Sequence, residues 1–270
     1  MSAITNIRRF ALLPILLIQL AAVLFAQNPA DLEKQLPQAK GAERVELLLK
    51  LAEVYMYRSP DKVILYAQQA YEAAAGSPRD SARALLDRGT GYFQLSDLDH
   101  AEESYRQSLK LAEGLQDHLL IGGCLNGIAA VSLKRGQLDT SLARFTEAVS
   151  HLEKAPKKDK LAGVFNNISL IYYTKGQYDQ SLEYMFKALR LYEEIGNDAG
   201  QGIVLNSIGN VYSKLSRPAE ARANFERALA IAEKAQNKQL QVSCLVNIGE
   251  ICIKQREWDA ALDCLNRYPA

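Results

Sequence analysis

Apolar residues recur along the chain in pairs of runs that repeat about every forty residues. In each run the apolar residues are three or four positions apart, which predicts one buried face of an α-helix. The copy that begins near residue 202 shows both runs: Leu205, Ile208, Val211 and Tyr212, then Ala221, Phe225, Ala228 and Leu229. The stretch 205–209 has counterparts at 125–129, 165–169 and 245–249, always forty residues apart. A fixed period of this length predicts stacked helix–turn–helix units.

The period predicts an all-α fold, an α-solenoid that covers residues 45–270. The predicted repeats are 45–81, 82–121, 122–161, 162–201 and 202–241, followed by a partial repeat at 242–270. Residues 27–44 form either a linker or a half-repeat cap. Stacking supplies each repeat with a core that it cannot build alone, and it leaves a long concave surface.

Small residues recur at one site on each predicted helix and should let the two helices approach closely. On the first helix they are Ala52, Gly89, Ala129, Ser169, Gly209 and Gly249, and on the second they are Ala101, Ser141, Ser181, Ala221 and Ala261. Larger side chains recur beside them and are expected to fill the core: Tyr55, Tyr92, Tyr172 and Tyr212 at one position, and Tyr105, Phe145, Met185 and Phe225 at another.

These residues carry a family resemblance. The segment 206–212, Asn-Ser-Ile-Gly-Asn-Val-Tyr, followed by Ala221, Phe225 and Ala228, resembles the tetratricopeptide repeat. The forty-residue variant is similar to the repeats of kinesin light chain and of Pins-type polarity scaffolds. The resemblance implies a right-handed α-solenoid whose concave groove binds a protein or an extended peptide.

The amino terminus predicts export. Arg8 and Arg9 precede an apolar run from Phe10 to Ala26, and a polar segment follows at once. This order is typical of a secretory signal peptide over residues 1–26, with an uncleaved N-terminal anchor as the alternative. The protein is therefore expected to be periplasmic or extracellular, and it is membrane-anchored in the alternative.

The charge balance argues against nucleic acid as a partner. The formal net charge is +1, and the first 26 residues hold two arginines and no acids, so the remainder carries 1 − 2 = −1. Lys154, Lys157, Lys158 and Lys160 form the main basic cluster, but Asp159 lies among them. Such a mixed cluster is typical of a solvated loop.

No constellation of residues predicts catalysis, a metal site or a cofactor. His100, His118 and His151 are scattered over different predicted elements. The four cysteines do not form a disulfide framework; only Cys252 and Cys264, on facing helices of the last hairpin, could meet, and their bonding stays open. The protein is therefore interpreted as non-enzymatic.

One polar pattern repeats and gives the candidate binding site. Asn126, Asn166 and Asn206 lie three residues before the small site on the first helix. Asparagine is a mediocre helix former, so its recurrence favours another role, and its amide can both donate to and accept from a peptide backbone. The family places this position on the concave wall. The predicted groove also includes Asn167, Asn210, Asn247, Lys134, Lys214 and Lys254. In the alternative interpretation the asparagines bond one another and only set the stack.

The leading hypothesis is an exported scaffold that binds a protein or peptide segment in this groove. The front of the chain, at 31–36, 47–52, 59–62 and 66–70, resembles exported repeat regions of bacterial membrane signalling proteins. That resemblance implies the alternative, a sensory ectodomain of a truncated membrane protein with a histidine kinase, cyclase or helix-turn-helix output. A missing carboxyl-terminal part would then provide the membrane contact.

Overall fold

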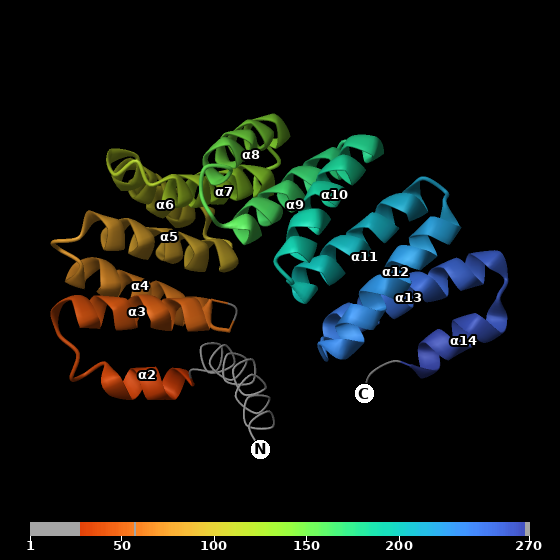
Figure 1. Cartoon of the computed structure of the whole chain (residues 1–270), viewed down its shortest axis with the longest axis horizontal. Helices are drawn as coiled ribbons and strands as arrows, with labels where there is room; N and C mark the ends of the chain where they lie inside the picture. Colours follow the sequence, from red (N-terminus) through yellow and green to blue (C-terminus); the bar gives the residue numbers. More distant parts are fainter. Residues whose placement is uncertain (1–27, 57, 268–270) are drawn as a thin grey trace, which may run out of the picture. The chain divides into compact units, whose positions relative to one another are not determined.

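The computed structural model describes residues 28–56 and 58–267, and all regular structure in those ranges is helical (Figure 1). The predicted signal peptide or anchor lies outside the described residues. The all-α prediction is confirmed for the described part. The helices are α2 (Pro29–Gln35), α3 (Gly41–Tyr55), α4 (Pro60–Ala73), α5 (Pro78–Gln94), α6 (Leu98–Gly114), α7 (His118–Lys134), α8 (Leu138–Leu152), α9 (Lys158–Thr174), α10 (Tyr178–Glu194), α11 (Asp198–Lys214), α12 (Pro218–Lys234), α13 (Lys238–Gln255) and α14 (Trp258–Asn266).

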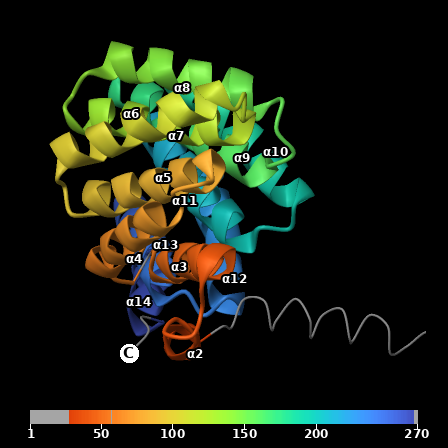
Figure 2. The same ribbon diagram turned by 90° about the vertical axis from the view of Figure 1, so that its left-hand side faces the viewer.

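The chain divides into two compact units, residues 1–115 and 116–270, which we describe separately. In the first unit α3 packs on α4, and α5 on α6, and the short helix α2 lies beside α3 (Figure 2). Leu32 of α2 is buried. Residues 29–35 thus pack onto the first hairpin instead of extending away as a tether.

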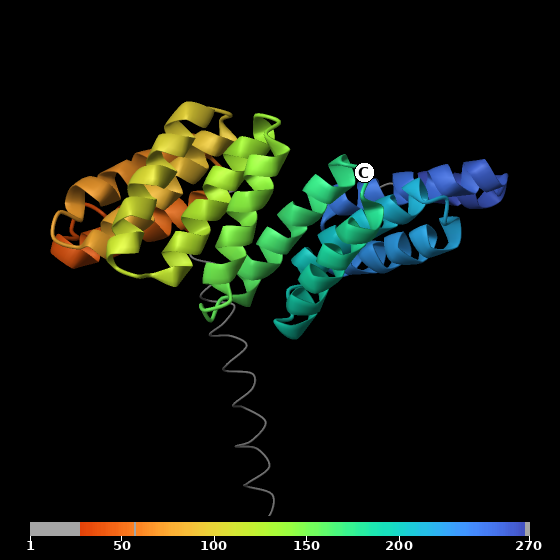
Figure 3. The ribbon, with the colours of Figure 1, turned by 90° about the horizontal axis from the view of Figure 1, so that it is seen from above.

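The second unit contains four successive hairpins, α7–α8, α9–α10, α11–α12 and α13–α14 (Figure 3). Within each hairpin the two helices pack along their length, and each second helix also packs on the first helix of the next hairpin. This is the tandem arrangement of an α-solenoid. We call α7, α9, α11 and α13 the first helices of this unit.

The first helices of the repeats begin about four residues before the predicted repeat boundaries, and polar side chains cap α5, α7, α11 and α13 at these early starts. Asp117 accepts hydrogen bonds from the backbone amides of Leu119 and Leu120, so α7 begins at 118 and not at 122. Asn197 and Asn237 cap α11 and α13 in the same way. Such caps satisfy amides that have no partner within the helix.

The turns inside the hairpins hold residues in the left-handed conformation. Gly136 has φ 75° and Gly176 has φ 73°, and Ser216 and Arg256 hold the same conformation at the equivalent turns. Pro218 then starts α12, where its missing N–H costs nothing.

The predicted close approach of the small sites is confirmed. Ser141 Oγ donates to the carbonyl of Ala129 over 2.7 Å, and Ser181 Oγ donates to the carbonyl of Ser169 over 2.9 Å. These bonds join the small position of the first helix to that of the second. The larger core set is buried as predicted: Tyr105, Phe145, Met185 and Phe225.

The other tyrosine position was predicted as core, and here the prediction is only partly right. Tyr55, Tyr92, Tyr172 and Tyr212 are half-buried. Their rings pack against other side chains but remain partly accessible to solvent. Tyr172 stacks on Tyr184, and Arg217 lies over the ring of Tyr212. A tyrosine hydroxyl needs water or a hydrogen-bond partner, whereas phenylalanine has no such group, which explains the incomplete burial.

In the described part of the chain, none of the helices combines the length and apolar character needed to cross a bilayer.

Candidate peptide-binding face

The predicted groove asparagines meet in pairs between neighbouring first helices. Asn167 Nδ2 donates to Asn126 Oδ1 over 3.0 Å, which joins α9 to α7. Asn247 Nδ2 donates to Asn206 Oδ1 over 3.1 Å, which joins α13 to α11. The partners are 41 residues apart, so each bond joins Asn126 or Asn206 to the residue that follows the equivalent position of the next repeat.

These pairs join neighbouring repeats, as the alternative interpretation expected, but they run to Asn167 and Asn247 and do not link Asn126, Asn166 and Asn206 to one another. They do not exhaust the amides, because each side chain offers two donor hydrogens and an oxygen with two lone pairs. All of the pair members are only partly buried. The two interpretations are therefore compatible, and the binding role stays a prediction.

The remaining predicted residues lie on the same helices. Asn166 and Asn210 are half-buried on α9 and α11. Lys134 and Lys214 are the last residues of α7 and α11, and Lys254 lies near the end of α13, so all three are exposed at helix ends.

Exposed aliphatic side chains accompany the asparagines, and the sequence analysis missed them. Leu170 on α9 is 48% exposed, Ile203 on α11 is 51% exposed, and Val246 and Ile253 on α13 are 41% and 53% exposed. Ile203, Asn206 and Asn210 follow a spacing of three and four and share one side of α11. We call the surface made by these side chains the first-helix face: Asn126, Asn166, Asn167, Asn206, Asn210, Asn247, Leu170, Ile203, Val246 and Ile253.

A comparison across repeats could have found these aliphatic residues. The positions equivalent to Ile203 hold Gly123, Gly163 and Ser243. Those equivalent to Leu170 hold Ala130, Asn210 and Glu250. A large apolar residue where the other copies have small or polar ones does not serve the common core.

The α9–α10 hairpin carries an aromatic cluster. The ring of Tyr184 stacks on Tyr172 with centroids 5.5 Å apart and meets Phe165 at 5.9 Å. Lys187 Nζ lies 4.6 Å from the centre of the Tyr184 ring. Burial raises the pKa of Tyr184, so its phenol stays neutral and packs as an apolar group.

The structure corrects the interpretation of the histidines as scattered. His118 begins α7 and His151 lies in the last turn of α8, and their Nδ1 atoms are 2.9 Å apart. An antiparallel hairpin brings the start of its first helix to the end of its second, which explains the meeting. Across residues 28–56 and 58–267 there is no group of three or more His, Cys, Asp or Glu side chains placed to hold a metal ion.

The four cysteines are buried free thiols. Cys252 and Cys264 line one cavity of about 260 Å³ between α12, α13 and α14, so the two predicted neighbours do lie together. Burial raises the pKa of both thiols, and it raises the pKa of Cys244 to about 11. Neutral thiols of this kind pack as small apolar groups.

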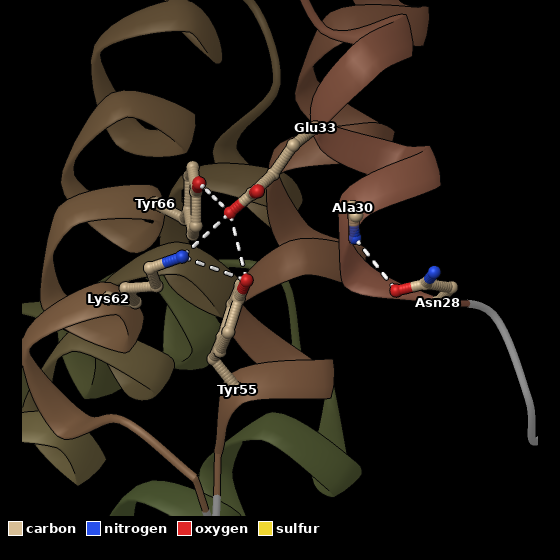
Figure 4. A network of polar contacts seen from close by, with 6 residues as sticks. All are labelled: Asn28, Ala30, Glu33, Tyr55, Lys62 and Tyr66. Atoms are coloured by element: carbon tan, nitrogen blue, oxygen red, sulfur yellow. Dashed lines mark hydrogen bonds and ion pairs between the residues drawn. The ribbon is translucent and has the colours of Figure 1, made fainter.

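In the first unit a separate polar network ties α2 to the first hairpin (Figure 4). Glu33 Oε1 accepts from Tyr55 Oη at 2.9 Å, from Lys62 Nζ at 2.9 Å and from Tyr66 Oη at 2.7 Å. The bond from Tyr66, followed by those from Lys62 and Tyr55, lowers the pKa of Glu33 from 4.5 to about 2. Burial first, and then the bond to Glu33, raises the pKa of Tyr66 to about 12.

Comparison with known protein families decides what these hairpins are. A tetratricopeptide repeat model matches residues 120–194, 160–234 and 200–268, which together are more than half of the chain. The chain belongs to the tetratricopeptide repeat family. A second tetratricopeptide repeat model matches residues 82–114 in the first unit. Family membership supports a scaffold that binds other proteins.

Solved structures share the fold at low sequence identity. BtubC (BKLC) from P. vanneervenii is 20% identical, with a TM-score of 0.61 over 88% of this chain and 89% of that one. The Rap conjugation gene regulator of plasmid pLS20, solved with the Phr* peptide, is 15% identical, with a TM-score of 0.64 over 82% of this chain and 62% of that one.

The tetratricopeptide-like repeats of a putative kinesin light chain from Podospora anserina are 14% identical, with a TM-score of 0.53 over 72% of this chain and 97% of that one. Among curated protein sequences, none matches the chain significantly.

Proposed function

We propose that this tetratricopeptide repeat protein is an exported, non-enzymatic scaffold that holds an extended segment of another protein against its first-helix face. The observation that carries the proposal is the mixture of paired amides and exposed aliphatic side chains on α9, α11 and α13. Aliphatic side chains that served the core would be buried. A face that contacted only water would carry charged residues at these positions instead.

The two kinds of side chain suit two parts of a peptide. An extended peptide presents unpaired backbone N–H and C=O groups, which amides can meet with either a donor or an acceptor. Its side chains can cover aliphatic groups such as Ile203 and Leu170, which are half exposed in the free protein. Covering such a side chain removes apolar surface from water and favours binding.

A relative of the same fold supports the proposal. The Rap regulator of plasmid pLS20 was solved in complex with a peptide. The aromatic cluster of α9–α10 also supports it, because side chains that are already packed together lose little conformational freedom when a ligand binds.

A peptide selection tests the proposal. Peptides are selected from a random displayed library against the protein, and the best one is titrated against variants by calorimetry. Ile203→Ser should weaken binding about fivefold, since about 1 kcal/mol of apolar burial is lost from a half-exposed side chain. Phe186→Ser is the matched control, because Phe186 is 46% exposed but lies on α10, a second helix. Equal weakening by both variants, or none by either, would contradict the proposal.

Asparagine variants test the amide contribution in the same titration. Replacing Asn126 and Asn167 together by alanine should weaken binding by about 0.5–1.5 kcal/mol per lost ligand bond. Asn224→Ala is the control, because Asn224 lies on α12 and its Nδ2 bonds to the carbonyl of Glu220. If the double variant melts lower but binds the peptide as tightly as the wild type, the amides only set the stack.

A further inference from the structure

The three donors that hold Glu33 form an arrangement that does not depend on Glu33. Lys62 Nζ donates to Tyr55 Oη over 2.9 Å and lies 4.3 Å from the centre of the Tyr55 ring. The rings of Tyr55 and Tyr66 stack with centroids 5.8 Å apart. All three residues belong to the first hairpin, α3–α4, so this hairpin positions the donors whether or not α2 is in place.

The donors converge on a single carboxylate oxygen. Tyr55, Lys62 and Tyr66 all reach Glu33 Oε1, at 2.7–2.9 Å (Figure 4). One ammonium charge balances one carboxylate charge, and the two phenols add neutral donors. Hydrogen bonds to a charged acceptor are the strong ones, so this set selects a carboxylate.

The helix that supplies the carboxylate buries little of its own surface, although after the helix Leu36 packs on the core and Ala39 is buried. Helix α2 has seven residues, and Leu32 is its one buried residue. Beyond the helix, Arg44 Nη1 donates to the carbonyl of Leu36 over 2.8 Å. A helix this short does not persist alone in water, and segments with few buried contacts open first.

We infer that Tyr55, Lys62 and Tyr66 form a binding site for an acidic side chain on a partner segment, and that α2 fills this site as an internal competing ligand. A partner that presents a glutamate or aspartate next to an apolar residue can replace α2, because it reproduces the contacts of Glu33 and Leu32. The site lies in the first unit and is independent of the proposed function of the first-helix face.

Competition between α2 and a free copy of its own sequence tests the inference. The probe is a fluorescently labelled synthetic peptide with the sequence of residues 28–40, titrated by anisotropy against the full chain. In the wild type, tethered α2 has a high effective concentration and excludes the probe. The double substitution Leu32→Ala and Glu33→Ala empties the site. It should therefore bind the probe at least about tenfold more tightly than the wild type does.

Two substitutions show whether the carboxylate and its donors are responsible. In the double-variant background, Lys62→Met should abolish probe binding, and Lys50→Met should leave it unchanged. Lys50 is the matched control: its side chain is 46% exposed against 42% for Lys62, and it pairs with Glu46 at 2.8 Å on α3. A probe carrying Glu33→Gln should bind at least about tenfold more weakly than the native probe, because a charged acceptor makes the stronger bond.

Three results would overturn the inference: equal probe binding by the wild type and the double variant, no probe binding by either, or indifference to Glu33→Gln in the probe. If circular dichroism shows that the double variant has lost its fold, the wild type is tested directly. Excess unlabelled probe should then speed hydrogen exchange of the α2 amides in the chain, and unchanged exchange would overturn the inference.

Discussion

At the scale of single residues, Gly209 and Gly249 show how surroundings decide what one position tolerates. They are equivalent glycines in consecutive repeats. A Cβ at Gly209 would lie 2.5 Å from Cε1 of the buried Phe225, whereas the nearest atom to a Cβ at Gly249 is Cys264 Cβ at 3.7 Å. The first distance is a clash and the second is ordinary contact.

We expect Gly209→Ala to be less stable than Gly249→Ala by about 1–3 kcal/mol, because overpacking forces Phe225 or the helix backbone to shift. Both substitutions gain the same helix propensity, so the difference isolates the clash. Urea midpoints measured by circular dichroism decide this. Equal midpoints would contradict the assigned packing of Gly209 against Phe225.

A second residue-scale prediction concerns the pH dependence of α2. The folded-state pKa of Glu33 is about 2, below its ordinary 4.5, so the stabilisation of α2 by this carboxylate is complete above about pH 4.5. It is lost as the pH falls toward 2, because protonation removes the charged acceptor. Hydrogen exchange of the α2 amides should differ between the wild type and Glu33→Gln at pH 5 and converge near pH 2. A constant difference over this range would show that the carboxylate does not hold α2.

Sequence alone predicted the candidate asparagines, with bonding among them as the alternative, but not which of them pair. The forty-residue period places Asn126 and Asn206 at equivalent positions, but the bonds run to Asn167 and Asn247, one residue off the period. Which side chains touch depends on the rotation between neighbouring hairpins, and a linear pattern does not contain that rotation. Exposure of Ile203 is different, because its small or polar counterparts Gly123, Gly163 and Ser243 already indicate that this position does not serve the common core.

At the scale of elements, the hairpins were predictable because local signals and the period agree. Apolar spacing, left-handed turn residues and Pro218 all indicate the same two helices per repeat. The early starts of α7, α11 and α13 coincide with caps such as Asp117, which lie outside the apolar pattern. His118 and His151 meet because α7 and α8 are antiparallel, which places the start of α7 beside the end of α8. The spacing of the two histidines in the sequence does not indicate this by itself.

In two hairpins an ion pair joins the start of the first helix to the end of the second helix. The acidic and basic positions are exchanged between the two hairpins. Lys158 and Glu194 close α9–α10 with Nζ and Oε2 2.7 Å apart, and Asp198 and Lys234 close α11–α12 with Oδ2 and Nζ 3.0 Å apart. Asp198→Lys should therefore cost up to about 1 kcal/mol, and adding Lys234→Glu should restore stability to within about 0.5 kcal/mol.

Urea unfolding of the single and double variants at low and high salt measures this coupling. Salt should shrink the effect, since both groups are exposed. If the double variant is as unstable as the single one, the two positions do not interact as a pair.

At the scale of the whole molecule, the proposed export depends on the first 26 residues. The basic residues Arg8 and Arg9, the apolar run from Phe10 to Ala26 and the polar segment that follows predict cleavage after Ala26. We expect an intact mass that begins at Gln27 for protein recovered from the exported fraction. A mass that retains residues 1–26 would indicate a membrane-anchored protein.

The central claim is that a peptide binds on the first-helix face, and hydrogen exchange with mass spectrometry tests it most directly. The protein is exchanged with and without a saturating amount of the peptide selected on it. The account predicts slower exchange in α9, α11 and α13, with little change in the second helices α10 and α12. Protection confined to the second helices, or absent from α11 at saturation, would contradict it.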